Sequence, residues 1–103
     1  MRKFKDKLSE LADVSHIKKI TLLDATGVEC GHILNQPGTQ GSIKLYNHLF
    51  LVFVELNVNA ANEGLRLYCE HVLDAKNNPG KHPNIDCLLD IIETKKTLKI
   101  VIT

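Results

Sequence analysis

Residues 43–56 constrain the fold of this chain more than any other segment, because they contain its longest apolar run, residues 49–54. The run alone would suit a buried strand. The apolar positions of the whole segment, however, repeat at helical spacing: Ile43, Leu45, Tyr46, Leu49, Phe50 and Phe53. The segment is longer than a usual strand and follows Ser42, a good N-cap residue. We therefore predict a helix over residues 43–56.

Such a helix would be apolar around nearly its whole circumference from residue 49 to residue 54. A helix of this kind must be buried on more than one side. A chain of 103 residues forms a single domain, residues 1–103, whose one core covers one side of the helix. We therefore expect the second side of this helix to contact a partner subunit. Our first functional hypothesis is therefore a non-enzymatic homodimer or protein-interaction module, built around the 43–56 helix.

The other periodic segments complete the predicted fold. Helices are expected over residues 2–13, 60–76 and 83–94, and strands over residues 17–23, 28–34 and 97–103. Asn59 is the expected cap of the 60–76 helix, and Gly64 within that helix would permit close packing against a neighbour. The predicted fold class is α+β, with a small three-stranded sheet (the hairpin plus the C-terminal strand) covered by four helices, in the order α-β-β-α-α-α-β.

Composition argues against several classes of function. The formal net charge is +1, Trp is absent and five residues are aromatic, so a nucleic-acid partner is not expected. No apolar run approaches the roughly 20 residues that span a bilayer, and no signal-peptide pattern follows the basic start. The three cysteines are widely spaced and form no Cys-x-x-Cys pair, which favours free thiols in a reducing compartment. These observations predict a cytoplasmic protein without a membrane partner.

Chemistry, if the chain performs any, should reside between residues 70 and 86. His71, Asp74, His82 and Asp86 flank a Pro-Gly turn that would join two antiparallel helices. His71 and Asp86 would lie at a similar distance from the turn along the two helix axes. Two imidazoles and two carboxylates placed in this way could ligate a divalent metal, or supply a general base oriented by a carboxylate. The hypothesis of a shared site gains support if the two imidazoles lie within about 5 Å of each other across a solvent-reachable cleft, and loses support if they point apart. The purely structural alternative assigns Asp86 to a helix first turn and Asp74 to the adjoining turn.

The glycine-rich loop over residues 35–42 is the second candidate site. A loop before a helix can present backbone amides to an anion at the positive end of that helix, so Gly38, Gln40, Gly41 and Ser42 are predicted ligand-binding residues. The loop lacks the Lys-Ser/Thr ending of a phosphate loop, and a plain strand-to-helix connection is the alternative. No catalytic residue follows from the sequence, which leaves enzymatic activity open. The cofactor is unknown, with a divalent metal as one possibility.

Three stretches carry a resemblance to a known family. They are Asn35-Gln36-Pro37-Gly38-Thr39-Gln40-Gly41-Ser42, Glu63-Gly64-Leu65-x-Leu67-Tyr68 and Pro79-Gly80-x-His82-Pro83-Asn84-Ile85-Asp86. In these the chain resembles a family of small bacterial proteins known as a domain of unknown function, over nearly its whole length. The resemblance implies a bacterial, single-domain, cytoplasmic protein. It implies no activity, substrate or catalytic residue.

Overall fold

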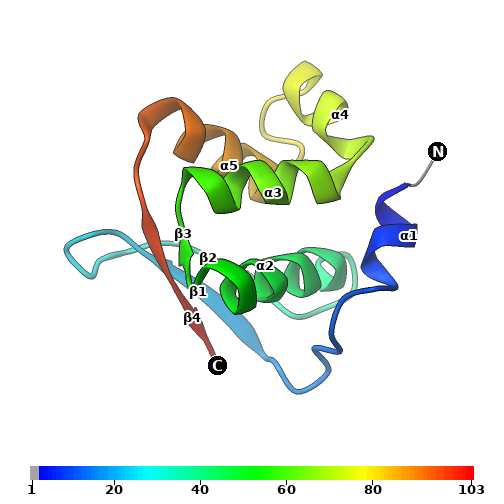
Figure 1. Ribbon diagram of the computed structural model, residues 1–103, viewed down its shortest axis with the longest axis horizontal. Helices are drawn as coiled ribbons and strands as arrows, with labels where there is room; N and C mark the ends of the chain where they lie inside the picture. Colours follow the sequence, from blue (N-terminus) through cyan, green and yellow to red (C-terminus); the bar gives the residue numbers. More distant parts are fainter. Residues whose placement is uncertain (1–2) are drawn as a thin grey trace.

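The computed structural model describes residues 3–103 and contains helices and one sheet in an α+β arrangement (Figure 1). The elements are α1 (Phe4–Leu8), β1 (Lys19–Leu23), β2 (Glu29–Leu34), α2 (Gln40–Phe53), β3 (Glu55–Leu56), α3 (Val58–Tyr68), α4 (His71–Asn77), α5 (Pro83–Thr94) and β4 (Leu98–Ile102). The predicted fold class is confirmed in outline. Within the described residues there are five helices and four strands, where the sequence predicted four helices and three strands.

The sheet is antiparallel throughout, in the order β2-β1-β4-β3. The predicted hairpin forms between β1 and β2, with an irregularity in the register next to Gly31. The C-terminal strand joins the hairpin through β1, pairing Ile20 with Ile102 and Leu22 with Ile100. Alternate residues of the two central strands therefore point to one face, which is the buried one.

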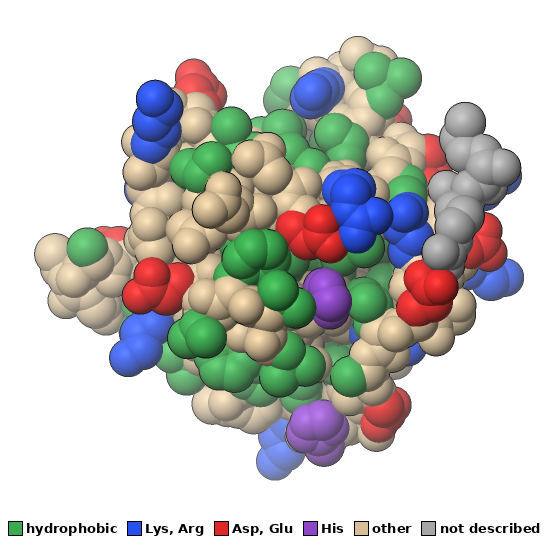
Figure 2. Space-filling model, in the orientation of Figure 1, with side chains coloured by type: hydrophobic (Ala, Val, Ile, Leu, Met, Phe, Trp, Pro, Cys, Tyr) green, Lys and Arg blue, Asp and Glu red, His purple; other side chains and the backbone are tan. Residues whose placement is uncertain are grey.

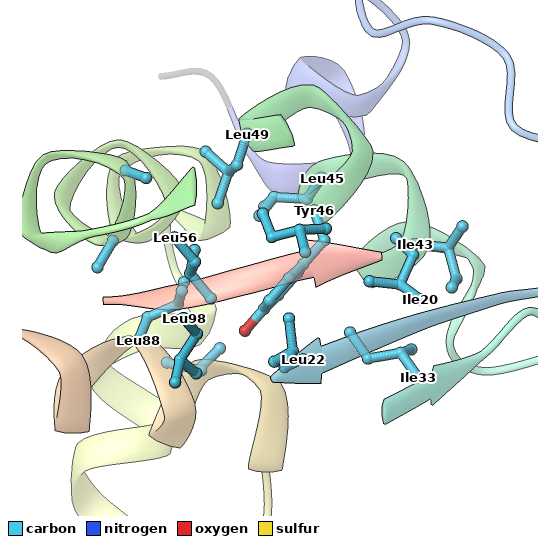
Figure 3. Packing of buried hydrophobic residues seen from close by; sticks show 14 of the residues in the cluster. Ile20, Leu22, Ile33, Ile43, Leu45, Tyr46, Leu49, Leu56, Leu88 and Leu98 are labelled. Atoms are coloured by element: carbon cyan, nitrogen blue, oxygen red, sulfur yellow. The ribbon is translucent and has the colours of Figure 1, made fainter. Parts of the chain in front are cut away.

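The core lies between that face and the helices. Leu22 and Leu98 from the sheet meet Tyr46 and Leu49 from α2 and Leu88 from α5, all nearly or fully buried (Figure 3). Tyr46 is the largest fully buried side chain, and its hydroxyl donates to the carbonyl of Asn84 at the start of α5. This bond connects the core to the helix end that forms part of the candidate site.

The middle segment is helical, as predicted, but its bounds differ. α2 begins at Gln40, so Ser42 lies inside the first turn and is not the N-cap residue. The helix ends at Val54, which adopts a positive φ of 69°. The next two residues pair with β4 as the unpredicted strand β3, because Leu56 is fully buried opposite Leu98.

The predicted helix over residues 60–76 is wrong in one respect, because it is two helices. Cys69 has a φ of 55°, which ends α3 and lets α4 start in a new direction. The N-cap residue is Asn57, whose side-chain oxygen accepts from the amide of Ala60 at 2.8 Å, so the prediction of Asn59 as the cap is also wrong. α3 thus begins two residues earlier than predicted.

The first predicted helix, residues 2–13, is much shorter, and its residue 2 lies outside the described residues. α1 stops after Leu8, where the Ser9 hydroxyl donates to the carbonyl of Asp6 at 2.7 Å. Further along, Val14 and Ile17 enter the core from the connection between α1 and β1.

Two further features bear on function. Leu51 and Val52 at the end of α2 are 61% and 57% exposed, and adjacent Val54 is 63% exposed. Figure 2 shows hydrophobic side chains gathered on the surface over this end of α2. Among residues 3–103, no helix has the length and apolarity that crossing a membrane demands.

Candidate functional site

A cleft of about 430 Å³ opens where α1, the start of α2, the end of α3, α4 and the start of α5 meet. Its lining comes from four places in the sequence: Phe4 in α1; Gly38, Thr39, Gly41 and Ser42 at the start of α2; Tyr68 and His71 around the α3–α4 break; and Lys81, His82, Pro83, Asn84 and Ile85 at the start of α5. Figure 1 shows α1 beside the N-terminal end of α2. The two sites predicted separately from the sequence, the glycine-rich loop and the histidine cluster, therefore form one cleft.

Asp74 orients His82. The Nε2 atom of His82 lies 2.6 Å from Oδ2 of Asp74, and Nζ of Lys81 lies 3.1 Å from the same oxygen. Hydrogen bonds from His82 and then Lys81 lower the pKa of the Asp74 carboxyl. An ionised carboxylate only accepts, so the shared proton is carried by Nε2 of His82. The imidazole is thereby fixed in one tautomer, which is the arrangement that carboxylates impose on functional histidines.

His71 forms the facing wall. The ring centroids of His71 and His82 are 5.8 Å apart and the rings are inclined at 45°, slightly farther than the separation of about 5 Å that we expected for a shared site. Phe4 packs its ring against the edge of His71, with centroids 5.1 Å apart. The break at Cys69 positions His71, because it turns α4 so that its first residue faces the start of α5.

The glycine-rich loop supplies the backbone wall of the cleft. The first backbone bond of α2 runs from the amide of Ile43 to the carbonyl of Thr39, and no side chain caps the helix start. The amides that precede Ile43 in α2 therefore have no acceptor within the helix. Ser42 shares a hydrogen bond of 2.7 Å with the hydroxyl of Tyr68, whose pKa is raised mainly by burial. Gln40, also predicted as a ligand residue, lines a neighbouring hollow instead.

The four predicted metal ligands are only partly brought together. His71, His82 and Asp74 lie around the cleft, but the Asp86 carboxylate accepts from the amide of Gly80 at 2.9 Å and closes the Pro-Gly turn. Within residues 3–103, no group of three or more His, Cys, Asp or Glu side chains is arranged to hold a metal ion. The described residues therefore supply at most two imidazole ligands to a cation in this cleft.

Carboxylates are absent from the described lining of the cleft. Glu70 lies nearby, but one of its oxygens accepts from the amide of Phe4 at 3.0 Å. Asp74 and Asp86 are held by the partners given above. The lining itself combines an ammonium group, two imidazoles and helix N-terminal backbone. Asp74 pairs with Lys81, so the donors that can meet a negative group are the remaining ammonium protons of Lys81 and the backbone amides at the start of α2.

Sequence reasoning did not identify Phe4, Tyr68, Lys81 or Asn84 as site residues. Asn84 lies inside the Pro79–Asp86 stretch that carries part of the family resemblance, which was a usable signal, whereas Lys81 is the unspecified position of that stretch. Tyr68 is only 3% exposed, and its hydroxyl bonds to Ser42 at the cleft. Phe4 reaches the site through tertiary docking of α1, for which the sequence carries no local signal.

A family model described as "uncharacterized protein conserved in bacteria (DUF2322)" matches residues 4–102. The chain belongs to this family. The match begins at Phe4 and ends at Ile102, so it includes every residue that lines the cleft. Neither the curated proteins nor the solved structures contain a match to the chain.

Proposed function

We propose that this family member binds a small organic anion in the cleft between α2 and α5. The observation that carries the proposal is the composition of the lining, which has an ammonium, two imidazoles and helix-start backbone but no carboxylate among the described residues. All three nearby carboxylates are occupied by internal hydrogen bonds. A volume of about 430 Å³ suits a small molecule, since ligand pockets run from roughly 300 to 1,000 Å³.

The roles of the side chains follow from their partners. Asp74 keeps His82 in one orientation and also holds Lys81 at the cleft, so one carboxylate positions both the imidazole and the ammonium group that can meet an anion. His71 faces His82 from the other wall. The start of α2 adds backbone amides and the partial positive charge of a fourteen-residue helix.

Binding of acetate and inorganic phosphate, followed in ¹H–¹⁵N NMR spectra, tests this proposal. We expect saturable shifts in the amides of residues 38–42 and 81–85, and several-fold weaker binding after Lys81→Met. Lys99→Met is the matched control, because Lys99 lies on β4 and does not line the cleft. Shifts scattered over surface lysines, or equal affinities in wild type and Lys81→Met, would contradict it.

A divalent metal is the alternative occupant of the same cleft. A carboxylate that holds one ring nitrogen of a histidine commonly orients the other nitrogen toward a metal, and Asp74 holds His82 in this way. His82 and His71 would then supply two ligands, and the small molecule would supply others. Zinc titration of tag-free protein decides the matter: His71→Ala and His82→Ala should each weaken binding, whereas identical binding by all three proteins rules out these ligands.

A second candidate function is self-association through α2, which we propose from the exposure of Leu51, Val52 and Val54. Burying such side chains in a dimer would remove apolar surface from water at about 25 cal/mol per Å². Light scattering should show a dimer at micromolar concentration that Leu51→Ser dissociates. Leu73→Ser is the control, because Leu73 is 66% exposed but lies on α4. A wild-type monomer would refute this function.

A further inference from the structure

The cleft has two chemically different halves. Lys81, His71 and His82 supply the polar half together with the start of α2, whereas Phe4, Pro83 and Ile85 supply apolar surface. Ile85 is only 1% exposed and so forms a fixed part of the wall. A bare anion such as phosphate would use the polar half alone. Binding of an anion alone does not explain why the other half of the cleft is apolar.

Phe4 is the most distinctive member of the apolar half. Its ring stacks on Tyr68 with centroids 5.1 Å apart and planes inclined at 22°, and it meets the edge of His71 at 5.1 Å. A Cβ atom on Gly41 would lie 3.1 Å from Cε2 of Phe4, so the ring also touches the glycine-rich loop. Phe4 therefore bridges the histidine wall and the backbone wall of the cleft.

Phe4 docks α1 at the cleft. The five-residue helix has no buried residue, and its first amide donates to Oε1 of Glu70 at 3.0 Å. The Phe4 ring is partly buried and packs against the core, with one part of it lining the cleft. An aromatic side chain placed this way can contact a ligand as well as the core.

Resting on the proposed function, we propose that the ligand is an aromatic carboxylate and that Phe4 is the specificity-determining residue. Lys81 and the backbone amides at the start of α2 receive the carboxylate, and the ring of the ligand packs against Phe4 and the imidazole of His71. Aromatic pairs prefer offset-stacked or edge-to-face contacts, and the tilted rings around the cleft offer both. One such contact, together with burial of the ligand ring, favours an aromatic acid over acetate roughly tenfold.

The test compares benzoate with acetate by NMR titration in four proteins: wild type, Phe4→Ala, Phe4→Leu and Phe53→Ala. Wild type should bind benzoate roughly tenfold more tightly than acetate. Phe4→Ala should weaken benzoate binding more than acetate binding and so remove most of this preference, and Phe4→Leu should retain part of it. Phe53→Ala is the matched control, since Phe53 is half-buried on α2 and does not line the cleft.

The outcomes separate this inference from the proposed function. Equal affinities for benzoate and acetate in wild type would overturn the aromatic ligand but leave anion binding intact. Equal losses for both anions in Phe4→Ala would show that Phe4 only supports the fold of the cleft, which also overturns the inference. If Phe4→Ala proves unfolded, Phe4→Leu decides, because full wild-type preference in that variant would exclude a role for the aromatic ring. Absence of binding by either anion would overturn the proposed function itself.

Discussion

Gly64→Ala probes the helix packing that positions both walls of the cleft. Gly64 lies inside α3, where a Cβ atom would stand 2.7 Å from Cδ1 of Leu88 on α5 and 3.1 Å from Cδ1 of Leu49 on α2. Both leucines are fully buried, so neither can move aside into solvent. The sequence predicted a close approach at this glycine, and the structure confirms it.

The magnitude follows from two opposing terms. Replacing Gly by Ala inside a helix stabilises it by about 1 kcal/mol. Forcing a methyl group into a packed core costs about 1–3 kcal/mol, and two immovable neighbours place this site toward the upper end of that range. We therefore expect a net loss of about 1–2 kcal/mol in the free energy of unfolding. For a domain of this size, this lowers Tm by roughly 5–10 °C.

Urea unfolding followed by circular dichroism at 222 nm measures the effect. Asn62→Ala is the matched control, because Asn62 lies exposed on the same helix and should gain about 0.5 kcal/mol from helix propensity alone. In a double-mutant cycle, Leu88→Ala should relieve the strain of Gly64→Ala by about 1 kcal/mol. If Gly64→Ala stabilises the protein as Asn62→Ala does, α3 does not pack on α5 as described.

Three further predictions concern single contacts. Asn57→Ala should lower the free energy of unfolding by about 1 kcal/mol through loss of the α3 cap, whereas Asn59→Ala should leave it nearly unchanged in the same urea experiment; the reverse order would show that the cap is misplaced. Tyr46→Phe should cost about 1 kcal/mol, because it removes the part-buried hydrogen bond from the Tyr46 hydroxyl to the carbonyl of Asn84, and an unchanged urea midpoint would disprove that bond. The pKa of Asp74 is lowered by His82 and Lys81, so its contribution to stability is present above the ordinary carboxyl pKa and is lost as the pH falls through the lowered value. Asp74→Asn should therefore flatten the acid-side fall in stability below about pH 4, and an unaltered pH profile would mean that the three groups do not interact.

The outline of the fold could be predicted from the sequence where periodicity is sustained. The helical stripe of residues 43–56 outweighed the strand propensity of its apolar run, and it predicted α2 correctly. β3 could not be predicted in this way, because a strand of two residues is too short to show a repeating pattern of apolar residues. The sequence did not reveal the end of α3, because the residue with the positive φ there is Cys69 and not a glycine, which is the usual signal for a helix end. α1 was overestimated, and Val14 and Ile17 enter the core from the connection that follows it.

The site could be predicted in part for a similar reason. The Pro-Gly turn indicated that His71 and His82 would approach each other, and their rings do lie 5.8 Å apart. Asp86 was assigned to the metal set, but the same turn uses its carboxylate to hold the Gly80 amide. The meeting of this turn with the glycine-rich loop and with Phe4 depends on tertiary packing between segments far apart in the sequence.

The central claim is that the cleft between α2 and α5 accepts an organic anion. A crystal structure of the protein with benzoate at saturating concentration tests it most directly. We predict benzoate in the cleft, with its carboxylate beside Lys81 and the start of α2. Benzoate bound only at other surfaces, with the cleft filled by water, would contradict the claim.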